Sequence, residues 1–181
     1  DTLAFGVYRR ISLLEAGMFD ERLTRNQDIE MNYRLRSMGQ RIVLDPSCKV
    51  YYEPRTSIRA FVRQNFENGK WNVWTVAHVR RMILSWRHFV PMAFVLSILI
   101  LSAARTSSSL ADVLLRLGWM SYTLLAVVST IKACASEKDV RCFPAVFLFP
   151  LTHLSYGAGS LWGLVALPFI NRHSSERRID R

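Results

Sequence analysis

Long stretches without charge in the second half of the chain constrain its fold more than any other feature. Three runs, residues 89–104, 110–131 and 143–170, are predominantly apolar, and the last has 28 residues without a charged side chain. A helix needs about 20 apolar residues to cross the hydrocarbon core of a bilayer. A chain of 181 residues has too little protein to bury three such helices. The sequence therefore predicts a transmembrane region over residues 89–171, with about three hydrophobic segments.

The third run, residues 143–170, is longer than one membrane span and contains residues that interrupt helices. Three prolines and three glycines fall within it. One long, broken helix and a re-entrant hairpin are both compatible with this composition. The basic tail of residues 172–181 favours the hairpin, because a single span would place its arginines outside and the positive-inside rule keeps them inside.

The first half of the chain is polar and basic. Residues 1–88 carry 15 Lys+Arg and 9 Asp+Glu, whereas residues 89–181 carry 9 and 5. Residues 76–88 combine Trp and Arg beside the first apolar run, which is typical of an amphipathic helix or linker at the lipid headgroups. By the positive-inside rule, residues 1–88 are predicted to be cytoplasmic because three arginines directly precede that run: Arg80, Arg81 and Arg87.

Two short helices are predicted near the start of the chain. Residues 12–15 have the capping-box pattern of a helix start, and Gly17 suits the position after the helix end. A second helix is predicted over residues 27–38, with Asn26 as its N-cap and Gly39 after its last turn.

Two short strands are predicted after these helices, over residues 41–44 and 49–52, each followed by a proline-containing turn. Two helices and two strands are too little for a complete α/β core, because strand edges and helix faces would stay uncovered. The chain also begins at Asp1, without an initiator Met. We therefore expect the first part of the chain to be the second half of a larger α/β domain.

Asp28 is the residue best suited to chemistry. It lies in the first turn of the predicted helix, where the helix dipole favours a charged carboxylate that can accept a proton from a hydroxyl. It shares a helix face with Met31 and Leu35, which are predicted to pack inward. Glu30 lies about 200° further round the helix, so we expect it to pair with Arg34 at i+4 instead.

Several short motifs occur in a fixed order in residues 1–75: Gly17-Met18-Phe19-Asp20-Glu21, Asn26-Gln27-Asp28-Ile29-Glu30-Met31-Asn32-Tyr33-Arg34-Leu35-Arg36, Gly39, Asp45-Pro46 and Tyr52-Glu53-Pro54-Arg55. In this order and spacing they resemble the acceptor half of family 2 glycosyltransferases. The likeness is greatest to the membrane-bound bacterial enzymes that assemble succinoglycan and related exopolysaccharides. Each motif is weak by itself, and the ordered set ahead of membrane spans makes the resemblance specific.

The resemblance implies an inverting, hexosyl-type glycosyltransferase. Residues 1–75 would be the acceptor-side half of a GT-A domain, an α/β fold, followed by an α-helical transmembrane region. The donor would be a nucleotide diphosphate sugar, and the acceptor a lipid-linked or other glycan, in the synthesis of exopolysaccharide or another cell-surface glycan. The donor-binding half, with the ligands of a Mg²⁺ or Mn²⁺ ion, would lie upstream of Asp1, so the fragment alone would be inactive. The enzyme would be a multi-pass protein of the bacterial inner membrane, with its catalytic part in the cytoplasm.

The resemblance also implies roles for individual residues. Asp28 occupies the position of the catalytic base, and Gln27 stands where the family has a second acid. Phe19, Asp20 and Glu21 match the loop that lines the acceptor pocket. The other positions that the resemblance assigns to substrate binding are Glu30, Arg55, Gln64 and Trp71.

Gln64 matches the start of the Gln-x-x-Arg-Trp element of processive synthases. The sequence departs from that element, because Glu67 stands in place of its Arg and Asn68 in place of its Trp. Trp71 could supply the stacking surface for a sugar ring instead. The departure argues against a processive synthase and favours the addition of a single sugar.

A different class of function also fits the sequence: a non-enzymatic integral membrane protein whose basic cytoplasmic head is a binding module. An adaptor of this kind needs no carboxylate on the inward face of a helix start, so Asp28 separates the two readings. Nucleic-acid binding is not expected, because the basic residues form no recognisable nucleic-acid-binding motif. A transporter is disfavoured, because the apolar runs hold no acidic group suited to ion coupling.

Overall fold

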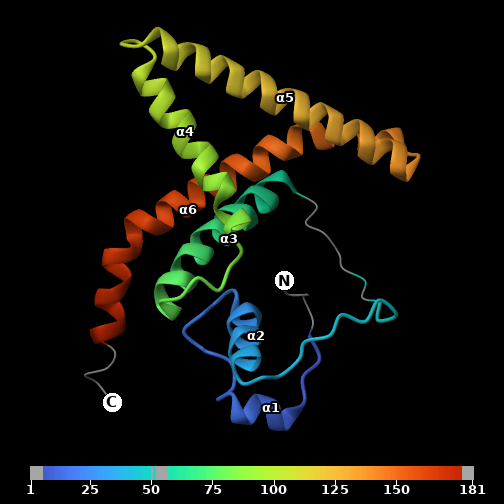
Figure 1. Ribbon diagram of the computed structural model, residues 1–181, viewed down its shortest axis with the longest axis vertical. Coiled ribbons are helices and arrows are strands. Elements are labelled where there is room, and N and C mark those ends of the chain that lie inside the picture. The colour runs from blue at the N-terminus through green and yellow to red at the C-terminus, as the bar shows by residue number, and fades with distance from the viewer. Residues whose placement is uncertain (1–5, 50, 52–56, 177–181) are drawn as a thin grey trace.

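The computed structural model describes residues 6–49, 51 and 57–176 (Figure 1). Within these residues every regular element is helical, and two of the helices are long and apolar enough to span a membrane. The elements are α1 (Arg10–Glu15), α2 (Gln27–Ser37), α3 (Ile58–Val79), the short 3₁₀ helix η1 (Trp86–Phe89), α4 (Val90–Ala104), α5 (Ser109–Glu137), the 3₁₀ helix η2 (Val140–Cys142) and α6 (Ala145–Glu176).

The prediction of an α/β acceptor half is wrong, because the described residues form no strand. Residues 41–44, expected to be a strand, have no regular structure, and Val43 and Leu44 are 80% and 64% exposed. A strand is held by hydrogen bonds to a neighbouring strand, and no described segment supplies them here. The second expected strand, residues 49–52, lies partly outside the described residues.

The predicted start of α1 is also wrong, whereas its end is correct. The helix begins two residues before Ser12, with Arg9 at the N-cap position, so the expected capping box does not form. Gly17 follows the helix with φ +82°, a left-handed conformation that glycine adopts without strain. The amides of Gly17 and Met18 donate to carbonyl groups of the last turn, which closes the helix as expected.

The second helix, α2, has nearly the predicted bounds. It begins at Gln27 as expected, ends at Ser37, and is followed by Gly39 with φ +79°. Asn26 occupies the predicted N-cap position, but its side chain makes no capping hydrogen bond. The inward packing expected for Met31 and Leu35 is confirmed, since they are 0% and 4% exposed.

Two apolar helical stretches are long enough to cross a membrane, Trp86–Ala104 and Ser109–Glu137. Their most apolar windows are 0% and 6% buried within the protein. The tight turn between them, residues 105–108, lies at the end of the hairpin furthest from α2 (Figure 1). Helices with this length, composition and exposure are typical of membrane proteins.

The third apolar run forms a single helix, α6, rather than the re-entrant hairpin that the basic tail favours. Pro150 and Pro168 lie inside this helix. A proline removes one backbone hydrogen bond and pushes against the preceding turn. Figure 1 shows that α6 bends in its C-terminal part and continues past the bend, so the chain does not turn back.

The helix α3 packs lengthwise against α6, and glycines bring the two backbones together. A Cβ atom at Gly69 would overlap the carbonyl oxygen of Tyr156, and one at Gly159 would overlap that of Phe66. Small residues at such crossings allow close backbone approach, as in membrane helix pairs. The residues expected to form an interfacial segment, 76–88, divide between the last turn of α3, a loop and η1.

The helix α4 crosses α6 at another glycine, because a Cβ atom at Gly157 would overlap the carbonyl oxygen of Pro91. Further along the hairpin, aromatic side chains join the three long helices. The rings of Phe94 and Tyr122 stack with centroids 4.7 Å apart, and the Tyr122 hydroxyl lies 2.8 Å from His153 Nδ1. These contacts fix α4 and α5 to the α3–α6 pair that carries the candidate site.

Candidate functional site

The predicted base, Asp28, lies in the first turn of α2 and is half-buried. Within the part of the chain that the structure describes, no side chain or amide is hydrogen-bonded to its carboxylate. Tyr8 is its electrostatic neighbour: burial raises the pKa of the Tyr8 hydroxyl, and the negative charge of Asp28 raises it further. Tyr8 donates to Asn32 Oδ1 at 3.1 Å, so its ring is held beside α2.

Glu30 is more enclosed than Asp28. The expected pairing with Arg34 is confirmed, with Nε–Oε1 and Nη2–Oε2 distances of 2.7 Å. Arg34 also donates to the carbonyl oxygens of Ala16 and Met18, which lie just before the loop of residues 19–26 that leads into α2. Because Glu30 is only 6% exposed and its charge is compensated, it serves to hold the loop on α2.

Asp20 is occupied in an ion-pair cluster. Arg22 donates to both of its carboxylate oxygens, at 2.9 and 2.8 Å, and His78 Nε2 lies 2.8 Å from Oδ2. The hydrogen bonds from Arg22 hold the pKa of Asp20 well below its usual range, against a raising effect of burial, and the contact with His78 lowers it further. Since His78 belongs to α3, the cluster ties the loop before α2 to that helix.

Phe19, in the same loop, and Gln27, the first residue of α2, lie close to Asp20. Phe19 meets the ring of Tyr8 edge-on, with centroids 5.8 Å apart, and Gln27 Nε2 donates to the carbonyl oxygen of Asp20 at 3.4 Å. Glu21 is exposed. The structure thus gathers Phe19, Asp20, Glu21 and Gln27 around the start of α2, where Asp28 lies.

The remaining predicted positions do not join this cluster. Gln64 and Trp71 lie on α3, and within the described residues no side-chain hydrogen bond or ring contact connects them to the loop. Trp71 instead meets Trp74 edge-on, with ring centroids 5.0 Å apart. Arg55 lies outside the described residues.

Sequence reasoning missed the polar face of α3, which receives the loop. Its members are spaced by four, three and three residues along one side of the helix: Asn68, Asn72, Thr75 and His78. Arg25 Nη1 donates to Asn68 Oδ1 at 2.5 Å. The signal was present in the sequence, because polar residues three or four positions apart along an amphipathic helix predict a polar face.

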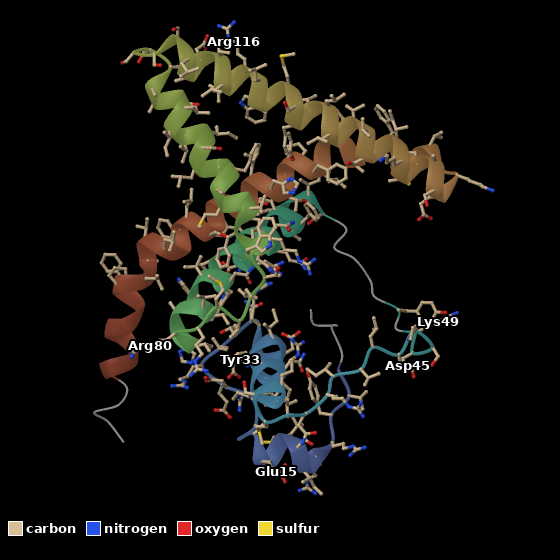
Figure 2. The ribbon with its side chains drawn as sticks, in the orientation of Figure 1. Glu15, Tyr33, Asp45, Lys49, Arg80 and Arg116 are labelled. Atoms are coloured by element: carbon tan, nitrogen blue, oxygen red, sulfur yellow. The ribbon has the colours of Figure 1, made fainter. Side chains whose placement is uncertain are left out.

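A second contact joins α2 to the end of α3. Arg81 Nη1 donates to the Tyr33 hydroxyl at 2.9 Å. Figure 2 shows Tyr33 on the side of α2 that faces the C-terminal end of α3, where Arg80 lies. The head formed by α1, α2 and their loops is therefore attached to α3 at two places.

The described residues do not form a site for a divalent ion. No group of three or more His, Cys, Asp and Glu side chains in the described part of the chain could hold a metal ion. Asp28 and Glu30 have the spacing of a metal motif, but Glu30 is engaged by Arg34. Two open grooves, of about 930 and 280 Å³, lie between α4 and α5, and Asp28 lines neither.

Comparisons with known protein families, with curated proteins and with solved structures find no match for this chain.

Proposed function

We propose that this chain supplies the acceptor side and the membrane anchor of an inverting, hexosyl-type glycosyltransferase of family 2. The observation that supports it most is the carboxylate of Asp28, half-buried at the start of α2 and without a hydrogen-bond partner among the described residues. A structural carboxylate in such a place is normally paired. An unpaired one is available to accept a proton from a substrate.

In the proposed reaction Asp28 acts as the general base. One oxygen of its carboxylate takes the proton of an acceptor hydroxyl while the hydroxyl oxygen attacks the anomeric carbon of the donor sugar. The bond from that carbon to the diphosphate breaks, its electron pair leaves with the nucleoside diphosphate, and the configuration inverts. The donor site would belong to a second half of the enzyme, and the residues described here would bind and orient the acceptor.

The proposed location is the inner membrane of a bacterium, in a multi-pass protein with the head in the cytoplasm. Two helices with the length and composition of membrane spans support this placement. The head is attached to α3, which in turn packs on α6. Asp28 is therefore held at the same end of the molecule as the start of α4. A lipid-linked acceptor at the bilayer surface would therefore reach the base without leaving the membrane.

The test is Asp28→Asn in the complete enzyme, expressed in bacterial membranes. We expect transfer of sugar from a labelled nucleotide diphosphate sugar to the lipid fraction to fall by about 100-fold or more, the usual contribution of a general base. Glu15→Gln is the matched control, because Glu15 is an exposed acid on α1 that points away from the site (Figure 2). Unchanged transfer in Asp28→Asn, at equal membrane content, would overturn the assignment.

The alternative function is a non-enzymatic binding module on a membrane anchor. One observation favours it: Asp28 lines neither of the two open grooves between α4 and α5. The same experiment separates the two proposals, because a binding module has no transfer activity for Asp28→Asn to remove.

A further inference from the structure

A series of hydrogen-bonded polar side chains connects the loop before α2, through α3, to α6. Asn26 Nδ2 donates to Asn72 Oδ1 at 2.8 Å and to Thr75 Oγ1 at 3.1 Å, and Asn72 Nδ2 in turn donates to the Tyr156 hydroxyl. Asn72 is 4% and Thr75 0% exposed. Buried amides that satisfy one another in this way fix a single arrangement of the elements that carry them.

Asn26 shows what this chain of contacts does to the backbone. Its φ of 62° and ψ of 18° are left-handed, a region that non-glycine residues adopt at a cost. Asparagine at a helix start normally turns its side chain back to cap its own helix. Here the side chain points to α3 instead. The contacts with Asn72 and Thr75 therefore hold the residue that directly precedes α2.

At the opposite end of this series of contacts, the backbones of α3 and α6 lie against each other. The face of α3 that meets α6 has Gly69 in backbone contact with Tyr156, and Trp74 Nε1 donates to the carbonyl oxygen of Gly163 at 3.1 Å. Helices in backbone contact have little freedom to slide, because side chains do not cushion the crossing. Any shift of α6 is therefore transmitted through Asn72 to the loop.

We infer that Asn72 is a positioning residue for the proposed base, and that it couples α6 to the proposed acceptor site. Asn26 lies two residues before Asp28. By linking Asn26 to Tyr156, Asn72 sets the position of Asn26 and, with it, that of Asp28. The inference rests on the proposed function for its catalytic consequence. The docking of the loop that it requires can be measured without activity.

Docking is measured by cross-linking in the complete protein, with the three cysteines Cys48, Cys134 and Cys142 changed to Ser. Cysteines replace Arg25 and Asn68, whose side chains touch in the structure, and a short bismaleimide joins them only when the loop lies on α3. Three variants are compared in this background: Asn72→Leu, which has similar volume and no polar group, Asn72→Asp, and Tyr156→Phe. Glu67→Gln is the control, because Glu67 lies on the same helix and pairs with Lys70 instead.

We expect the cross-linking rate to fall by about fivefold or more in Asn72→Leu, because the partly buried side chains of Asn26 and Tyr156 both lose a hydrogen-bond partner. Tyr156→Phe removes a single hydroxyl and should have a smaller effect in the same direction. Asn72→Asp should recover part of the loss, since its two oxygens can accept from Asn26 and from the Tyr156 hydroxyl. Glu67→Gln should cross-link like the parent.

Activity of the same Asn72 and Tyr156 variants, made without the cysteine pair, tests the coupling. The kcat for sugar transfer should fall in proportion to the cross-linking rate, while the KM for the nucleotide sugar stays the same. Parental cross-linking in both Asn72→Leu and Tyr156→Phe would overturn the inference, and so would reduced cross-linking with an unchanged kcat. Full activity of Asp28→Asn, by contrast, would overturn the proposed function and leave the cross-linking result to decide the docking.

Discussion

At the scale of single residues, Asp20 shows how a carboxylate in the loop before α2 is paired within the protein instead of facing solvent. The side chain of Asp20 is 14% exposed, and it receives Arg22 from its own loop and His78 from α3. Two donors on one carboxylate stabilise its ionised form, which is why the pKa of Asp20 lies below its usual range. The docked loop is therefore stabilised by a charge that acid can remove.

Acid should release the loop from α3. Because the hydrogen bonds from Arg22 and, to a smaller extent, the contact with His78 of α3 lower the pKa of Asp20, the ionised carboxylate stabilises the docked state above the ordinary value of 3.8. That stabilisation is lost as the pH falls through the lower value of the folded state. We expect the fluorescence of a probe on the exposed Thr24→Cys, in a cysteine-free background, to change as the pH falls from about 4 to about 2.

The variant Asp20→Asn should show the released fluorescence already at neutral pH and little further change in acid. Asp45→Asn is the matched control, since Asp45 also has a lowered pKa but owes it to Ser47 in a separate turn. Identical acid profiles for the parent and Asp20→Asn would contradict this role of Asp20.

Local chemistry predicted some residue contacts and could not predict others. The pairing of Glu30 with Arg34 follows from i,i+4 spacing alone, and the structure has it. Asn26 stands where a cap was expected, yet its side-chain amide donates a hydrogen bond to Asn72, which is 46 residues away in sequence. A helix start can be recognised from neighbouring residues, whereas the choice between two hydrogen-bond partners depends on which helix packs beside it.

At the scale of elements, the same difference separates helices from strands. The bounds of α2 are set by residues inside and next to it, so they were predictable to within one residue. The expected strand at residues 41–44 depends on partners elsewhere in the chain, and the described residues provide none. A short apolar run that ends at a proline-containing turn therefore indicated a strand that the rest of the fold does not support.

The α3–α6 crossing could have been anticipated from its glycines. Gly159 and Gly163 are four residues apart in an apolar helix, which is the small-residue pattern of close helix pairs. What the pattern does not reveal is the partner. The structure identifies α3, where Phe66 and Lys70 present their backbone carbonyl groups to these glycines.

Gly159→Ala should separate α3 from α6. The added Cβ would overlap the carbonyl oxygen of Phe66, which cannot move without its helix. Overpacking of this kind costs about 1–3 kcal/mol, so we expect a lower Tm in detergent and a slower cross-link between the cysteines at positions 25 and 68. Gly118→Ala is the control, because no atom lies within 4 Å of a Cβ at that glycine of α5. Equal Tm values for the two variants would contradict the crossing.

At the scale of the whole molecule, the head and the turn between α4 and α5 lie at opposite ends of α4. The head attaches through α3 near the start of α4, and the turn of residues 105–108 lies far from it (Figure 1). Arg80 and Arg81 lie on the head side and Lys138 and Arg141 follow α5, whereas Arg105 lies in the turn. An arrangement with two crossings places both basic segments on one side of the membrane, in accord with the positive-inside rule.

This topology can be tested with single cysteines in sealed membrane vesicles. Cys48 in the head and Cys142 in η2 should be on the same side, and Ser107→Cys in the turn between α4 and α5 on the other. Each is studied alone, with the remaining cysteines changed to Ser, and labelled by a maleimide that does not cross the bilayer. We expect the reagent to label position 107 in vesicles of one orientation and positions 48 and 142 only in vesicles of the opposite orientation. If all three positions react from the same side, α4 and α5 do not cross the membrane. The two helices would then lie on its surface, and the anchor of the proposed enzyme would have to be sought elsewhere.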